Sequence, residues 1–532
     1  MLSRNIAHRD TKLRLVGSAH HVLARFERNV APGSIALDKD QIDLHADVAL
    51  FRLAQPKGHP QRFDRGPDQA QPTIAEGRRS MLRAGSRGPD FRMSKPIGIT
   101  ILGQRSAAKG ALAGGHPPIR SLYLHVPFCF HKCHYCDFYS FVDKEDRQDA
   151  FVNSLITEIQ ALAPCFDPDS PRPALETIFV GGGTPSLLKP HLWESLLEVL
   201  HASFRPATAA RDGVDSLEGE TEFTVECNPE TVTPELMSVL RAGGVNRISI
   251  GAQSFNDGHL KTLERWHEPR NVARALRLAA EAGIPRSSID LIYGIPGQSL
   301  DDWRQDLETA LELRKLSPGF EHISCYALTY EAHTAMTMRR DRGEIAPIEE
   351  DVEAAMFEHA VQRLADAGLE RYEVSNFARP GRECRHNMAY WRQEQWLAAG
   401  PSASAHVYAG HTCQSGGWRW KNVPRLTDWM ESVQSTGGWS DLVDIEEPDP
   451  RRALAERVMT GLRLSEGIDG EDIVRTAESL GCDESLLGRF ERQCELGAAE
   501  QVGNRWRLTA RGFLIADLVV RDLMRAIRQG GA

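Results

Sequence analysis

Three cysteines, Cys129, Cys133 and Cys136, form the spacing C-x-x-x-C-x-x-C within the segment SLYLHVPFCFHKCHYCDFYSF. Thiolates are the protein ligands of iron–sulfur clusters. Three of them can bind three irons of a four-iron cubane and leave the fourth iron open, so that it can hold the amine and carboxylate of a small molecule. The spacing therefore predicts a [4Fe–4S] cluster with a site for an exogenous ligand.

A zinc site is the alternative for the same cysteines. Zinc usually takes four ligands in two close pairs, and His131 or His134 could complete a set of three thiolates and one imidazole. The remaining cysteines are scattered along the chain, which is typical of a reducing compartment rather than of a secreted disulfide scaffold. A triple-glycine segment at 181–183 has no role in a zinc ribbon and favours the cluster.

Short apolar runs alternate with amphipathic segments from Leu122 onward. We expect strands at residues 122–126, 177–181, 223–227, 247–251, 289–293 and 322–328. We expect helices at residues 151–162, 191–200, 234–243, 272–283 and 303–316. This alternation predicts an α/β fold with parallel strands and right-handed crossovers, and so many units favour a partial or complete β/α barrel. The functional site should then lie at the carboxyl ends of the strands.

Polar residues and glycines follow several of these strands. The glycines of FVGGGTPSLL would let backbone groups approach a ligand closely. Glu226 ends the third strand and suits a ribose hydroxyl or an amine, and the amide of Gln253 follows the fourth. Arg265 and Asp290 come next along the chain. Taken singly, such residues are more often capped or paired than functional.

Together with the cysteines, this pattern resembles the radical S-adenosylmethionine (SAM) superfamily, whose aromatic residue before the last cysteine is matched by Tyr135. Over roughly residues 118–530 the chain is similar to the oxygen-independent coproporphyrinogen III oxidase-like family. The resemblance implies a [4Fe–4S] cluster, S-adenosyl-L-methionine, an external one-electron donor and cleavage of SAM to methionine and a 5′-deoxyadenosyl radical. The residues it assigns to SAM binding are Tyr123, Tyr135, Gly182, Gly183, Thr184, Glu226, Gln253, Arg265, Asp290 and Ala327.

Two branches of that family differ near the cysteines. The decarboxylating oxidases of porphyrin biosynthesis carry a further cysteine two residues after the third. At that position this chain has Phe138, and the heme-chaperone branch also has phenylalanine there. The segment HNMAYW resembles that branch's heme-binding motif H-N-x-x-Y-W. The heme-binding candidates are His386, Asn387, Tyr390 and Trp391. A neutral imidazole could ligate iron and the aromatic rings could stack on the macrocycle, with His406 as a rival iron ligand.

The favoured function is a heme chaperone that binds heme and transfers it to an acceptor protein. The alternative is an oxygen-independent coproporphyrinogen III oxidase. The scaffold resembles coproporphyrinogen dehydrogenases, but Phe138 implies that the oxidase activity is absent.

Four segments are expected along the chain. Residues 1–117 are rich in Arg, Gly, Pro and His without regular apolar spacing, which predicts a poorly ordered extension, a targeting segment or a start codon placed too far upstream. Residues 118–375 form the barrel core, and residues 376–444 form a connecting region with the heme-binding motif. Helical patterns and a hairpin in residues 445–532 predict a C-terminal winged-helix-like α+β module.

The formal net charge of -10 argues against nucleic acid as a partner, and so against a DNA-associated regulator built on that module. A run of about 18 apolar residues, the signature of a transmembrane segment, does not occur in the sequence. A signal peptide is not recognisable either. We therefore expect a cytoplasmic protein.

Overall fold

The computed structural model describes residues 109–112, 115–206 and 220–529. The extension expected at residues 1–117 lies almost entirely outside the described residues.

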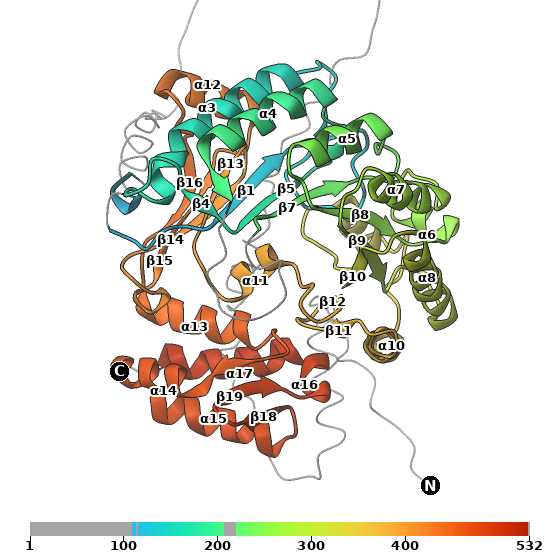
Figure 1. Cartoon of the computed structure of the whole chain (residues 1–532). Helices are drawn as coiled ribbons and strands as arrows, with labels where there is room; N and C mark the ends of the chain where they lie inside the picture. Colours follow the sequence, from blue (N-terminus) through green and yellow to red (C-terminus); the bar gives the residue numbers. More distant parts are fainter. Residues whose placement is uncertain (1–108, 113–114, 207–219, 530–532) are drawn as a thin grey trace, which may run out of the picture.

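Parallel strands form the centre of the molecule (Figure 1). In spatial order they are β10 (Phe320–Ala327), β9 (Arg286–Tyr293), β8 (Arg247–Gln253), β7 (Glu222–Cys227), β5 (Thr177–Gly182) and β1 (Ser121–Val126). The helices on their outer face are α3 (Gln148–Phe166), α4 (Pro190–Ser203), α5 (Pro234–Ala242), α7 (Arg270–Glu281) and α8 (Leu300–Leu313). The predicted α/β fold with parallel pairing is confirmed.

Burial explains why these elements could be recognised from the sequence. Strands covered on both faces read as nearly continuous apolar runs, and every residue of β8 is buried. Two of the covering helices, α5 and α8, begin at side-chain caps. The Thr233 hydroxyl accepts a hydrogen bond from the Leu236 amide at the start of α5, and Ser299 and Asp302 form a capping box at the start of α8.

The sheet continues beyond these strands at both edges. β13 (Trp396–Ala399) pairs with β1 in parallel, and β14 (Ser404–Tyr408), β15 (Gly417–Asn422) and β16 (Leu442–Glu446) extend it in antiparallel order. At the other edge, β12 (Asn376–Ala378) and β11 (Glu370–Arg371) follow β10. Residues 376–444 therefore do more than connect: they supply strands to the main sheet. Within the described residues β11 and β16 end the sheet unpaired with each other, so the barrel is partial.

A buried carboxyl group joins this added part of the sheet to α3. Glu158 accepts hydrogen bonds from the Gly400 amide at 2.7 Å, from Asn422 Nδ2 at 2.9 Å and from Trp429 Nε1 at 3.1 Å. Trp429 belongs to α12 (Leu426–Thr436). Burial raises the pKa of Glu158 to about 8 in spite of these three donors.

The C-terminal residues form a second core beneath the sheet (Figure 1). Its elements are α13 (Pro450–Gly461), β17 (Ile468–Asp469), α14 (Gly470–Leu480), α15 (Asp483–Glu495), β18 (Ala499–Val502), β19 (Arg505–Leu508), α16 (Ala510–Leu514) and α17 (Ala516–Gln529). Phe490 and Trp506 stack at its centre with ring centroids 3.9 Å apart. The helices followed by a hairpin have the order expected for a winged-helix-like module.

The remaining elements are short apart from the 17-residue helix α10. They are β2 (Phe128–Cys129), β3 (Phe141–Val142), β4 (Ala174–Leu175), β6 (Arg205–Pro206), α6 (Asp257–Thr262), α9 (Ala335–Asp341), α10 (Glu350–Asp366), α11 (Arg385–Trp391) and single turns of 3₁₀ helix at 185–187, 314–316 and 413–415. Among the described helices, none is both long and apolar enough to cross a membrane.

Candidate cluster and cofactor site

The three predicted cysteines lie in a loop that leaves the carboxyl end of β1. We call residues 129–136 the cluster loop. Neighbouring elements fix its backbone: the His134 amide donates to the Leu263 carbonyl at 3.3 Å, and the His134 carbonyl accepts from the Met336 amide at 2.9 Å. The cluster loop is therefore held between the segment after β8 and the start of α9.

Each cysteine sulfur has its own hydrogen-bond donor. Thr184 Oγ1 is 3.5 Å from Cys129 Sγ, Arg265 Nη1 is 3.7 Å from Cys133 Sγ, and Lys132 Nζ is 3.9 Å from Cys136 Sγ. Donors and cations beside a sulfur stabilise the thiolate, which is the form that binds iron. This donor set fits an anionic iron–sulfur cluster.

Burial opposes thiolate formation in the absence of a metal. It raises the pKa of Cys136 to about 11, although the Lys132 ammonium lowers that pKa in part. In the part of the chain that the structure describes, no three His, Cys, Asp or Glu side chains converge closely enough to hold one metal ion. Thiols that bind three different irons of a cubane need not converge in that way.

The triple-glycine turn packs directly against the end of β1. A Cβ on Gly182 would lie 2.4 Å from the His125 ring, and Gly182 has a φ of 105°. A Cβ on Gly183 would lie 2.7 Å from the Phe128 carbonyl oxygen, and the Gly183 amide donates to the Val126 carbonyl at 2.7 Å. The glycines therefore let this turn reach the start of the cluster loop.

Two carboxyl groups lie beside the glycine turn. Glu226 Oε2 accepts a hydrogen bond from the Gly182 amide at 3.2 Å. Burial, followed by repulsion from Asp290, raises the pKa of Glu226 to about 7. Burial also raises the pKa of Asp290, whose Oδ1 accepts from Ser249 Oγ at 3.2 Å. Near neutral pH Glu226 can accept or donate a hydrogen bond, as contact with a ribose hydroxyl or an amine requires.

Arg265 carries a buried donor without a partner. Its Nη2 donates to the Gly251 carbonyl at 3.0 Å, but no hydrogen-bond acceptor meets its Nε. A buried unsatisfied donor is costly, so an anionic ligand group there would relieve the cost. Gln253 lies beside it at an irregularity of β8, with a φ of 62°. Strained backbone of this kind often accompanies a binding site.

The other residues assigned to SAM fall at different depths. Tyr135, within the cluster loop, packs against a small apolar cluster that includes Leu263 and Met336, and Ala327 is the last residue of β10. Tyr123 lies deeper, with its hydroxyl 3.2 Å from His125 Nδ1 and its ring centroid 6.3 Å from that of Phe179 and 6.4 Å from that of His386. Most of the residues predicted to bind SAM therefore lie at the carboxyl ends of the strands, whereas Tyr123 lies deeper in the barrel.

The H-N-x-x-Y-W motif forms α11 and lies at the opposite end of the barrel (Figure 1). His386 Nδ1 is 2.8 Å from Thr177 Oγ1, its Nε2 is 2.8 Å from the Tyr390 hydroxyl, and its amide donates to Glu222 Oε1. Thr177 and Glu222 are the first residues of β5 and β7. Burial lowers the pKa of His386 to about 3, so the imidazole is neutral, with both nitrogens hydrogen-bonded.

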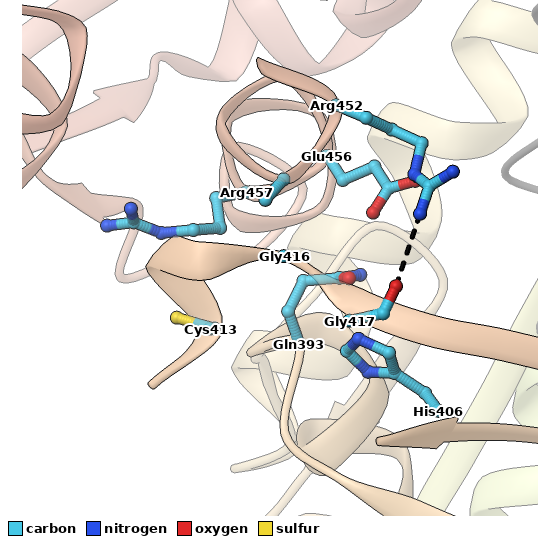
Figure 2. A pocket seen from close by; sticks show the side chains of 9 residues that line it. Gln393, His406, Cys413, Gly416, Gly417, Arg452, Glu456 and Arg457 are labelled. Carbon is cyan, nitrogen blue, oxygen red and sulfur yellow. Dashed lines mark hydrogen bonds and ion pairs between the residues drawn. The ribbon is translucent and has the colours of Figure 1, made fainter. Parts of the chain in front are cut away.

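The other heme candidates surround His386 in different settings. Asn387 and Trp391 are half-buried on the same helix. His406 is buried in β14, and its Nδ1 donates to the Glu394 carbonyl at 3.1 Å. A cavity of about 10 Å³ beside His406 is lined by Cys413, Gly417, Arg452 and Glu456, among others (Figure 2). That cavity has room for about one water molecule.

Sequence reasoning missed Lys132 as a member of the site. A signal was present in the sequence, because Lys132 is a cationic residue between two of the predicted ligand cysteines.

The partial barrel and the three-cysteine loop at its carboxyl end define a radical SAM protein. The family model for the radical SAM superfamily matches residues 123–310. Radical SAM proteins bind a [4Fe–4S] cluster and S-adenosylmethionine.

Relatives among curated proteins narrow this class. The heme chaperone HemW of Mycobacterium tuberculosis is 36% identical over 406 residues, which cover 76% of this chain and 94% of the relative. HemW of Bacillus subtilis is 33% identical, covering 70% of this chain and 89% of the relative. This chain belongs to the HemW family. The structure of the coproporphyrinogen III oxidase HemN from Escherichia coli shares the fold, with a TM-score of 0.64, 21% identity and coverage of 80% of this chain and 93% of that one.

Proposed function

We propose that this chain is a heme chaperone: it binds heme and transfers it to an acceptor protein, on a scaffold that also binds a [4Fe–4S] cluster and SAM. The observation that carries the proposal is the similarity to HemW proteins over nearly their whole length. Phe138, at the position of the oxidases' further cysteine, favours a chaperone over an oxidase.

We further propose roles for the site residues. Cys129, Cys133 and Cys136 hold the cluster, which supplies the electron for SAM cleavage when it is reduced by an external one-electron donor. The SAM-binding residues are Tyr123, Tyr135, Gly182, Gly183, Thr184, Glu226, Gln253, Arg265, Asp290 and Ala327. In this arrangement Glu226 contacts a hydroxyl or amine, and the Arg265 Nε donates to an anionic group of the ligand.

We propose that heme binds at α11, through His386, Asn387, Tyr390 and Trp391. If His386 Nε2 ligates iron, the Tyr390 hydroxyl must first leave it, because that hydroxyl now lies at hydrogen-bond distance. Ligand binding would thus be coupled to a change in α11, at the end of the barrel away from the cluster loop.

The chaperone and oxidase functions are separated by one assay. Anaerobically purified protein with a reconstituted cluster is given SAM, dithionite and coproporphyrinogen III, and the products are identified by mass. We expect 5′-deoxyadenosine without protoporphyrinogen. Formation of protoporphyrinogen would establish an oxidase and contradict the chaperone proposal.

The heme ligand is tested by titrating heme into the His386→Ala, Tyr390→Phe and His406→Ala variants. We expect His386→Ala to weaken heme binding about tenfold or more, which corresponds to about 1.4 kcal/mol. Tyr390→Phe should bind at least as well as the wild type, since it frees Nε2 of a competing hydrogen bond. Weakened binding by His406→Ala alone would assign the iron ligand to β14 instead, and circular dichroism verifies that each variant is folded.

A further inference from the structure

A lysine side chain is built into the cluster loop. Lys132 lies between the first two cysteines, and its half-buried ammonium group reaches the third. Its Nζ donates to the Phe138 carbonyl oxygen at 2.5 Å and to Ser140 Oγ at 2.9 Å, and lies 3.9 Å from Cys136 Sγ. These contacts join the first turn of the loop to the residues that follow Cys136. They hold a full positive charge beside one cluster ligand.

The two other sulfur contacts have different explanations. Thr184 is a neutral donor on the glycine turn, and Arg265 extends toward the expected SAM site with its unpartnered Nε. The three contacts of Lys132 all lie on residues 136–140, within and just after the cluster loop. Its charge is therefore directed at the cluster rather than at SAM.

We propose that Lys132 is a positioning residue that raises the reduction potential of the [4Fe–4S] cluster by fixing a positive charge at Cys136. The step concerned is the transfer of one electron from a low-potential one-electron donor to the cluster; no covalent bond or proton need change place. The cluster gains one negative charge, so a fixed nearby cation stabilises the reduced form more than the oxidised form. Net charge and hydrogen bonds to sulfur are known determinants of cluster potential. The inference goes beyond heme transfer and concerns only the cluster.

The structure also indicates why this charge is effective. The cluster loop is held between the segment after β8 and α9, and Lys132 is half-buried against residues 136–140. Solvent and salt screen a half-buried charge less than a fully exposed one. An exposed lysine elsewhere should therefore have little influence. Lys261, exposed on α6, offers the matched control, because its replacement removes the same charge.

The test measures the cluster potential by an EPR-monitored redox titration of reconstituted protein without SAM. Lys132→Gln removes the charge but keeps an amide that can donate to the Phe138 carbonyl, and Lys132→Arg keeps the charge. We expect a lower potential in Lys132→Gln, and a potential close to the wild type in both Lys132→Arg and Lys261→Gln. Iron per chain is determined for every variant.

Two results overturn the proposal. One is an unchanged potential in Lys132→Gln at full iron content. The other is equal iron loss in Lys132→Gln and Lys132→Arg, which would assign the lysine to the shape of the loop alone. Iron loss in Lys132→Gln but not in Lys132→Arg would instead support charge compensation at the cluster. None of these readouts depends on heme, so the proposal can fail while the chaperone function stands.

Discussion

At the scale of single residues, the site depends on close approaches that few side chains allow. The cysteine spacing and the glycine turn were both predicted from the sequence, since each is a local pattern. Their mutual contact was not, because it joins the end of β1 to the end of β5. Gly183 shows the consequence: its missing side chain is required by the backbone of residues 126–128 rather than by a ligand alone.

Gly183→Ala should therefore displace the cluster loop. The added Cβ would lie 2.7 Å from the Phe128 carbonyl oxygen and 2.8 Å from that of Val126, and neither backbone atom can rotate away. We expect a loss of unfolding free energy of about 1–3 kcal/mol and reduced iron per chain after reconstitution. The control is Gly488→Ala in α15, where an added Cβ meets nothing within 4 Å. Normal iron content in Gly183→Ala would show that the loop tolerates the shift.

At the scale of elements, α11 is attached to the amino-terminal end of the barrel through Glu222, a buried carboxylate that is itself ion-paired with Arg286 of β9. Glu222, the first residue of β7, accepts hydrogen bonds from Arg286 Nη1 at 2.9 Å and from the His386 amide at 3.1 Å. Burial alone would raise the pKa of Glu222, but the charges of Arg286, Arg247 and Arg385 outweigh it and hold the pKa at about 2. The helix that carries the H-N-x-x-Y-W motif thus depends on an ionised carboxylate.

The stability of the barrel should accordingly fall in acid. The pKa of Glu222 is lower in the folded chain than in the unfolded chain. Its contribution to the free energy of unfolding is therefore complete above the unfolded pKa of about 4.5 and is lost as pH falls toward the folded pKa of about 2. Glu222→Gln leaves Arg286 without its buried partner and should cost about 3–5 kcal/mol near neutral pH. The difference in unfolding free energy between wild type and variant, measured by urea denaturation, should shrink as pH falls from about 4.5 toward about 2, the window set by those two pKa values. A difference independent of pH would contradict this account.

The elements themselves were predicted unevenly, for physical reasons. The six parallel strands and their covering helices follow from buried apolar runs and amphipathic periodicity. The strands of residues 396–446 escaped prediction because they are short and contain buried polar residues such as His406 and Lys421, which interrupt the apolar pattern. The relative positions of α11 and the cluster loop depend on contacts between distant parts of the chain. The sequence therefore could not indicate that they lie at opposite ends of the barrel.

At the scale of the whole molecule, two cores are joined at the far edge of the sheet. The Arg371 guanidinium of β11 lies 3.6 Å from the centroid of the Phe513 ring in α16. The Arg371 carbonyl oxygen accepts a hydrogen bond from Ser465 Oγ at 2.7 Å. Glu373 forms a bridge with Leu464. Contacts of α11 with β5 and with α13 place the H-N-x-x-Y-W motif between the barrel and the C-terminal core. A heme bound at α11 would thus lie close to both units.

The pairing of β1 with β13 has a consequence for biosynthesis. β1 leads into the cluster loop, yet one of its edges is completed by Trp396 and the residues after it, which leave the ribosome hundreds of residues later. Pairings so distant in sequence form slowly, because much chain entropy is lost before they are made. The cysteines therefore emerge long before their supporting strand is enclosed, and iron delivered after chain completion would meet a better-formed loop than iron delivered during synthesis.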